Sequence, residues 1–188
     1  LEGVLSKLDY LQDLGINCIW FSPLYPSPNA DFGYDIADYK NIHKEYGNLD
    51  LFRQVLHGEH KRGMKVIMDL VVNHTSDEHE WFIKSKDPSS PYHDYYFWRK
   101  GRLGGKLPPN NWLSCFEGKA WERDEKSGEY YLHVFAKKQP DLNHDNPKVR
   151  QEVKDIMKFW LDMGVDGFRE DVITFISKRP GLPNGIPL

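Results

Sequence analysis

Long hydrophobic runs are absent from this sequence of 188 residues, and no stretch of about 18 apolar residues is available to cross a membrane. The opening segment, residues 1–15, has the pattern of an amphipathic helix. It lacks the basic region and the cleavage site of a secretory leader. The sequence therefore predicts a protein without membrane contact, and we expect a cytoplasmic location.

Cysteine is scarce, and neither sign of charge is in large excess. Cys18 and Cys115 form neither a disulfide framework nor a metal-binding spacing, so reduced thiols are expected. The formal net charge is −3, without a basic block, which argues against nucleic acid or an anionic membrane as the main partner. Aromatic residues, by contrast, make up 14% of the chain, with six tryptophans. They are numerous enough to line a ligand groove as well as fill a core.

One pattern occurs three times: an amphipathic helix, a glycine and a short apolar strand. Apolar residues at helical spacing predict helices from Val4 to Leu14, from Leu49 to Leu56 and from Pro147 to Met163. A glycine ends each pattern, because glycine accepts the left-handed turn that stops a helix. The strands that follow, INCIWFSP, MKVIMDLVVN and VDGFREDV, are nearly continuous in apolar character, which suits a parallel sheet buried on both faces. The pattern predicts an α/β fold.

A long insertion separates the second predicted strand from the third helix. Residues 74–145 hold scattered prolines and glycines, the aromatic run YHDYYFW and one alternating stretch, EYYLHVF, that predicts a strand. Ordinary loops between strands and helices have about 2–6 residues, so this insertion predicts a subdomain or a lid. The expected organisation is barrel segments 1–73 and 146–188 around the inserted unit 74–145. Since a complete (β/α)₈ barrel needs about 250 residues, we expect a partial barrel, part of a longer protein.

The sharpest chemical feature is GFREDV, residues 167–172. Because side chains alternate along a strand, Arg169 and Asp171 are expected on one side and Glu170 on the other. A guanidinium beside a carboxyl group favours its ionised form and lowers its pKa, as a carboxylate nucleophile requires. A purely structural ion pair explains the spacing equally well.

The segment DLVVNH, residues 69–74, ends the preceding predicted strand. Asp69 and Asn73 are four positions apart, so they are expected on the same side of the strand. His74 could donate a hydrogen bond to a sugar hydroxyl, although a lone histidine at a strand end is usually a satisfied polar residue. The following HTSDEH fits no standard zinc or calcium signature. We expect no bound metal or cofactor there, and we predict instead that Thr75 and Glu78 form a helix capping box.

Two further segments carry polar groups next to predicted strands and helices. DFGYD, residues 31–35, follows the first predicted strand and offers a carboxylate near a tyrosine ring. QPDLNHDNP, residues 139–147, ends the insertion. There Asp145 or Asn146 is expected to cap the third helix, which begins at Pro147.

Together these segments resemble the α-amylase superfamily, glycoside hydrolase family 13. DLVVNH looks like its first signature region, GFREDV like its second and QPDLN like a signature late in its inserted domain B. SPNADFGYD, DYYFW and LHVFAKKQPDLN look most like the oligo-1,6-glucosidase branch. The resemblance covers essentially the whole chain. It implies a partial TIM barrel, about strands 2 to 4, with domain B inserted after the third.

The resemblance also implies roles for particular residues. It makes Asp171 the nucleophile of a retaining α-glucosidase, supported by Arg169. The residues implied to line the pocket for the non-reducing glucose are Asp31, Tyr34 and His74, joined from the inserted domain by Phe116, Phe135 and Gln139. Val172 resembles the residue of members that prefer α-1,6 linkages. The implied partner is a neutral oligosaccharide with terminal α-1,6-linked glucose.

The chain departs from the family pattern in two respects. Glu170 stands where the branch often has an apolar residue, and a carboxylate buried among helices would need a basic partner. The family's acid/base glutamate and its transition-state aspartate belong to later strands, and its metal loop belongs near the first strand. We therefore expect this chain to need the remainder of the barrel for activity.

The sequence leaves other functional interpretations open. Related enzymes include α-1,4-glucosidase, dextran glucosidase, trehalose-6-phosphate hydrolase and sucrose isomerase. A non-catalytic relative, such as a transporter subunit, tends to lose the catalytic residues, whereas Asp171, Arg169 and His74 are present here. A carbohydrate-binding module fits poorly because such modules are usually β-sandwiches.

Overall fold

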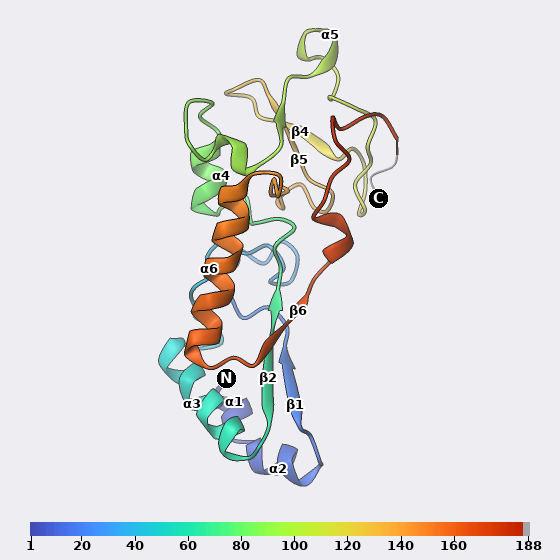
Figure 1. Ribbon diagram of the computed structural model, residues 1–188. Coiled ribbons are helices and arrows are strands. Elements are labelled where there is room, and N and C mark those ends of the chain that lie inside the picture. Colours follow the sequence, from blue (N-terminus) through green and yellow to red (C-terminus); the bar gives the residue numbers. More distant parts are fainter. Residues whose placement is uncertain (186–188) are drawn as a thin grey trace.

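The computed structural model describes residues 1–185, which form a sheet with helices on one side and a second, irregular lobe beyond the carboxyl ends of its strands (Figure 1). The lower part contains α1 (Glu2–Leu5), α2 (Leu8–Asp13), β1 (Cys18–Phe21), α3 (Leu49–Lys61), β2 (Lys65–Leu70), α6 (Pro147–Met163) and β6 (Gly167–Glu170). The upper lobe contains α4 (Glu80–Ser85), β3 (Trp98–Arg99), α5 (Arg102–Gly105), β4 (Trp121–Arg123) and β5 (Tyr130–Leu132). Two short 3₁₀ helices are η1 (His93–Tyr95) and η2 (Ile173–Phe175).

The main sheet has the order β1-β2-β6, and both pairings are parallel, as the repeated pattern predicts. Alternate residues of β2, namely Val66, Met68 and Leu70, are buried toward the helical side, where α3 and α6 lie in Figure 1. The opposite face is open, because Cys18 and Trp20 of β1 are exposed on it. The sequence predicts a sheet buried on both faces. Within residues 1–185, the face toward α3 and α6 is covered and the other is open.

Aromatic side chains fill the core between the sheet and its helices. Trp160 of α6 is fully buried and lies edge-on to Phe52 of α3 and to Tyr25, with ring centroids 5.5 and 5.7 Å apart. Its indole nitrogen donates to the carbonyl of Tyr39 at 2.8 Å. The core thus joins both helices to the loop that follows β1.

Helix α6 shows the sequence signals at both of its ends. The Asn146 side chain accepts a hydrogen bond from the backbone nitrogen of Lys148 at 2.9 Å, and Pro147 takes the first helical position. Of the two expected caps, Asn146 is the one used. Gly164 ends the helix with a φ of 114°, a conformation that residues with a Cβ rarely adopt.

Replacing Asn146 with alanine is expected to lower the free energy of unfolding by about 1 kcal/mol, because one backbone donor at the start of α6 loses its acceptor. Serine at the same position retains a capping oxygen and serves as the matched control. Denaturant unfolding of the whole protein and of both variants checks the effect. Equal midpoints for the alanine and serine variants would contradict it.

The first predicted helix is wrong as a single element, because the chain forms two short helices there. The backbone nitrogen of Lys7 donates to Val4, three residues back, and the Ser6 hydroxyl donates to Gly3 at 2.8 Å. Serine competes locally for backbone groups in this way, and glycine weakens a helix. Helix α1 therefore ends at Leu5, and α2 begins at Leu8.

The capping box predicted at Thr75 and Glu78 is also wrong. Thr75 is buried, and its hydroxyl contacts Tyr96 Oη and the carbonyl of Ser76, both at 2.8 Å. Helix α4 begins later, at Glu80, where His79 Nδ1 accepts from the backbone nitrogen of Trp81. The threonine hydroxyl is hydrogen-bonded in the core and therefore does not cap the helix.

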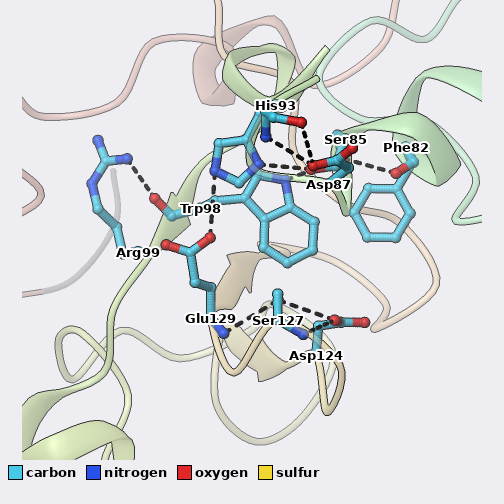
Figure 2. Close-up of polar contacts among 10 residues, drawn as sticks. Phe82, Ser85, Asp87, His93, Trp98, Arg99, Asp124, Ser127 and Glu129 are labelled. Atoms are coloured by element: carbon cyan, nitrogen blue, oxygen red, sulfur yellow. Dashed lines mark hydrogen bonds and ion pairs between the residues drawn. The ribbon is translucent and has the colours of Figure 1, made fainter. Parts of the chain in front are cut away.

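The upper lobe contains an antiparallel sheet with the order β3-β5-β4. The strand predicted in EYYLHVF is confirmed over the first part of that stretch, where β5 forms. The lobe is held together by stacked rings and by polar bonds, as Figure 2 shows: the His93 ring stacks on Trp98 at 5.7 Å, and Trp98 stacks on Phe82 at 5.6 Å. Trp98 Nε1 donates to Ser85 Oγ at 3.1 Å, and His93 Nε2 lies 3.4 Å from Glu129 Oε2. These contacts connect α4, η1 and the sheet.

The chain after β6 runs back to the upper lobe (Figure 1). Trp112 Nε1 donates to the carbonyl of Pro183 at 2.8 Å, and Asn110 Nδ2 donates to that of Leu182 at 3.1 Å. Across residues 1–185, no helix has the length and apolar character that a bilayer span requires.

Candidate functional site

Charged side chains gather where β2 and β6 end, on the open side of the main sheet. The register places Asp69 of β2 opposite Arg169 of β6. Arg169 Nη1 lies 3.0 and 3.1 Å from the two oxygens of Asp69, and 2.7 Å from Asp171 Oδ1. One guanidinium nitrogen therefore bridges two carboxylates.

Arg169 and Asp171 lie on the same side of the strand, as the alternation predicts. The Asp171 side chain is 13% exposed, and it contacts the Arg169 guanidinium, which lies 5.2 Å from the ring of Trp20 on the open face of the sheet. Glu170 is exposed in the described chain, so the expected cost of a buried, unpaired carboxylate does not arise there. The arrangement offers a partly shielded carboxylate held by a cation.

Asp69 lies beneath this pair and was given no role in the sequence interpretation. Its side chain is fully buried, and burial raises its pKa, although the hydrogen bond and charge of Arg169 act in the opposite direction. The Tyr34 hydroxyl donates to Asp69 Oδ2 at 3.1 Å. Burial and the nearby Asp69 charge raise the pKa of Tyr34 to about 12, which keeps this hydroxyl a donor. A charged residue inside an apolar strand was the signal that could have identified Asp69.

A second cluster joins the other predicted polar residues. Gln139 is fully buried, and its Nε2 donates to Asp31 Oδ2 at 2.9 Å and lies 3.0 Å from His74 Nε2. His74 Nε2 lies 3.1 Å from the carbonyl of Tyr34. Since the Tyr34 hydroxyl reaches Asp69, Tyr34 connects this cluster to the Arg169 cluster.

The loop that carries Asp31 is organised by Asp35. Its carboxylate is fully buried and accepts hydrogen bonds from the backbone nitrogens of Ala30 and Asp31, both at 2.9 Å, and from Ser27 Oγ at 3.0 Å. These bonds hold the turn that places Asp31 opposite Gln139.

The predicted aromatic residues form a wall beside His74. The ring of Phe135 lies 5.4 Å from that of His74 and 5.4 Å from that of Phe175. Phe116 lies 5.8 Å from Phe135 and is 54% exposed, so it is not an ordinary core residue in the described chain. Phe175 was missed in the sequence, since a single phenylalanine beyond the strand gave no signal.

Val172 lies directly after Asp171 and has a φ of 43°. A β-branched residue is strained in this left-handed conformation, by about 1–3 kcal/mol. The turn ends the strand, and the Val172 carbonyl accepts from the backbone nitrogen of Phe175 at 2.9 Å.

A buried ion pair holds the ends of β2 and the upper lobe together, and it too was missed. Lys178 Nζ lies 2.8 Å from Asp141 Oδ2 and donates to Asn73 Oδ1 at 2.9 Å. The three residues are far apart in sequence, so no local pattern could indicate their contact. Within residues 1–185, no group of three or more histidine, cysteine or acidic side chains is placed to hold a metal ion.

Residues 1–186 match the family model described as alpha amylase, catalytic domain. The chain is 60% identical over 188 residues to an oligo-1,6-glucosidase of Parageobacillus thermoglucosidasius, covering 100% of this chain and 33% of that protein. It is 54% identical over 186 residues to an alpha-glucosidase of Pediococcus pentosaceus, covering 98% and 33%.

A solved structure shows the same fold at high similarity. The isomaltulose synthase SmuA from Protaminobacter rubrum matches with a TM-score of 0.95 and 52% sequence identity, covering 98% of this chain and 33% of that one. The chain thus spans about a third of the length of the relatives it matches.

Proposed function

Because the chain belongs to the alpha-amylase catalytic-domain family, we propose that the whole protein is a retaining glycoside hydrolase that removes terminal α-1,6-linked glucose from isomalto-oligosaccharides. The observation that carries the proposal is the 2.7 Å contact between Arg169 and Asp171 on the open side of β6. The identity of 60% with an oligo-1,6-glucosidase supports the substrate class. The proposed substrate is neutral, and the proposed location is the cytoplasm.

In this proposal β1, β2 and β6 are strands two to four of a (β/α)₈ barrel. Residues 1–73 and 146–188 belong to the barrel, and residues 74–145 form the inserted domain B. The parallel order of the three strands and the separate antiparallel sheet of the upper lobe support this division. The open face of the main sheet is then the barrel interior.

Asp171 is the proposed nucleophile. Its carboxylate attacks the anomeric carbon, the bond to the leaving oxygen breaks, and a covalent glucosyl-aspartate forms that water then hydrolyses with net retention. A carboxylic acid about 5–5.5 Å away must protonate the leaving oxygen, and we assign it to the part of the protein outside this chain. The chain alone is therefore expected to lack turnover. Arg169 aligns Asp171 by donating to its Oδ1 and places a positive charge beside the carboxylate.

The second cluster is the proposed glucose pocket. Asp31 accepts hydrogen bonds from sugar hydroxyls, and His74 is the proposed donor beside it. Gln139 holds Asp31 in place by donating to its Oδ2. Tyr34 borders the pocket and links it to Asp69. The wall of Phe135 and Phe116 excludes water around the developing oxocarbenium ion.

A second candidate is sucrose isomerisation, because the matching structure of SmuA is an isomaltulose synthase. In this candidate, the fructose released from sucrose attacks the proposed glucosyl-aspartate in place of water. Asp171, Arg169 and His74 would serve either reaction. We therefore place hydrolysis first, on the higher identity to the oligo-1,6-glucosidase.

A substrate panel with the whole protein tests the proposal. Isomaltose, maltose, sucrose, dextran oligomers and trehalose 6-phosphate are compared by kcat/KM, and the anomer of the released glucose is followed by NMR. We expect isomaltose to be the best substrate and α-glucose to be released first. Isomaltulose as the main product from sucrose would favour the isomerase, and absence of turnover on every substrate would refute the enzyme.

Val172 is proposed to contribute to linkage preference. Replacing it with alanine removes two methyl groups beside the nucleophile and is expected to shift the ratio of kcat/KM for isomaltose over maltose about tenfold toward maltose, the scale of a methyl-sized change in a pocket. The panel measures this ratio in both proteins. An unchanged ratio would show that Val172 does not determine specificity.

A further inference from the structure

A buried lysine lies behind the proposed sugar ligands. The Lys178 side chain is 4% exposed, and its Nζ lies 2.8 Å from Asp141 Oδ2. The same nitrogen donates to Asn73 Oδ1 at 2.9 Å and to the carbonyl of Phe175. Asp141 is fixed in turn, since its Oδ1 accepts from the backbone nitrogen of Val134 at 3.0 Å. The ammonium thus donates to two oxygens and forms an ion pair with the buried carboxylate of Asp141.

The lysine determines how the Asn73 amide is turned. Because an ammonium has no lone pair, the amide atom that faces it must be the oxygen. The amide nitrogen, Nδ2, then points away and lies 3.1 Å from His74 Nδ1. An amide nitrogen only donates, so Nδ1 of His74 accepts and carries no proton.

The remaining ring nitrogen therefore holds the single proton of a neutral imidazole. His74 Nε2 lies 3.1 Å from the carbonyl of Tyr34, which is an acceptor. The Gln139 amide does not require His74 Nε2 to be an acceptor. Its orientation is fixed because the backbone nitrogen of Ala136 donates to its Oε1 at 3.0 Å. The two amide hydrogens of Gln139 have their own acceptors, Asp31 Oδ2 at 2.9 Å and the Tyr34 carbonyl at 3.3 Å.

We propose that Lys178 is a positioning residue that acts through Asn73 to keep His74 neutral, with its proton on Nε2 facing the glucose pocket. The inference deepens the proposed function, since it rests on His74 as a ligand of the substrate. A second proton on His74 would set an N–H against the N–H of Asn73. His74 is thus held as a donor at Nε2.

The charges around His74 act together with burial. Burial lowers the pKa of His74 and Lys178 lowers it further, whereas the nearby carboxylates Asp141 and Asp171 raise it. Asp31 reaches the site through Gln139. The net direction is downward, which favours the neutral ring that the hydrogen bonds of His74 require.

Asn73→Asp tests the relay while keeping the partner of Lys178. The new carboxylate can accept hydrogen bonds from both Lys178 Nζ and His74 Nδ1. It therefore favours a proton on Nδ1 of His74 and raises the pKa of that histidine. The measurement is NMR of the whole protein labelled with ¹⁵N-histidine. The His74 signals are assigned by their loss in the His74→Gln variant. The wild type should show an unprotonated, accepting Nδ1 of His74 at every pH from 5 to 8. The variant should show a protonated Nδ1 and a new titration in that range. A wild-type His74 protonated at Nδ1, or an unchanged spectrum in the variant, would overturn the proposal.

Removing the lysine charge gives a second test. Lys178→Met leaves Asp141 buried without a cation and risks misfolding, so it is combined with Asp141→Asn, which retains an acceptor for Val134. With Asn73 free to turn, the His74 signals should show both tautomers, and kcat/KM for isomaltose should fall about tenfold. Lys137→Met is the control, because Lys137 pairs with Glu122 at 2.9 Å on the surface and does not reach Asn73. Its His74 spectrum and its kcat/KM should match those of the wild type.

The spectra and the kinetics separate this inference from the proposed function. Expected spectra without turnover of any glucoside would reject the hydrolase and retain the relay. Turnover of isomaltose with a wild-type His74 spectrum in both relay variants would reject the relay and retain the hydrolase.

Discussion

Replacing Asp171 with asparagine in the whole protein is expected to lower kcat/KM for isomaltose by about a thousandfold or more, which corresponds to at least ~4 kcal/mol of transition-state stabilisation. The amide has nearly the shape of the carboxylate and can still accept a hydrogen bond from Arg169. It carries no charge, however, and is a poor nucleophile. The fold should therefore persist while the chemistry is lost.

Glu170→Gln is the matched control for this change. Glu170 is adjacent in sequence and points to the other side of the strand, away from the proposed active site, so its variant should retain wild-type kcat/KM within about twofold. Circular dichroism and thermal unfolding confirm that both variants fold. If the glutamine variant is inactive and the asparagine variant is active, the assignment of the nucleophile is wrong.

Replacing Arg169 with methionine is expected to lower kcat/KM at least about a hundredfold and to destabilise the protein by about 3 kcal/mol, because Asp69 then keeps a buried charge without its cation. Asp171 also loses its 2.7 Å partner, so it is no longer held in line for attack. Arg169→Lys keeps the charge but provides one ammonium in place of a planar guanidinium, and it should recover stability more than activity.

The pH dependence of the methionine variant gives a further check. Burial raises the pKa of Asp69, and Arg169 opposes that rise, so removal of the arginine raises this pKa further. A carboxyl group with a raised folded pKa favours folding at low pH and loses this advantage as pH rises through that pKa. The stability deficit relative to wild type should therefore be smaller at pH 5 than at pH 7.5. Thermal unfolding at both values measures it.

Arg53→Met is the control for removing an arginine. Arg53 pairs with Asp50 within one exposed turn of α3, and such surface pairs contribute about 0–1 kcal/mol. Its variant should show a small deficit that does not depend on pH in this way. An Arg169→Met deficit of the same size would mean that the bridge to Asp69 contributes little.

The repeated elements could be predicted because their signals are local. Helical spacing from Leu49 onward, the proline at 147 and the glycine at 164 each act through neighbouring residues, and α3 and α6 formed as expected. The alternation in GFREDV likewise placed Arg169 and Asp171 on one side. Local signals failed where a side chain found a stronger partner elsewhere, as when the Thr75 hydroxyl bonded to Tyr96 in the core.

Spacing along the chain was enough to predict the α/β pattern, the glycine turns that end the helices and the pairing of a guanidinium with a carboxylate two residues away. The bridge from Arg169 to Asp69, and the contact by which Lys178 orients Asn73 and through it His74, became visible only in the folded chain. The contacts of Arg169 with Asp69 and of Lys178 with Asn73 each join residues about a hundred positions apart. They form where parallel strands end at the same edge of the sheet, because buried polar groups there are stabilised by hydrogen-bond partners.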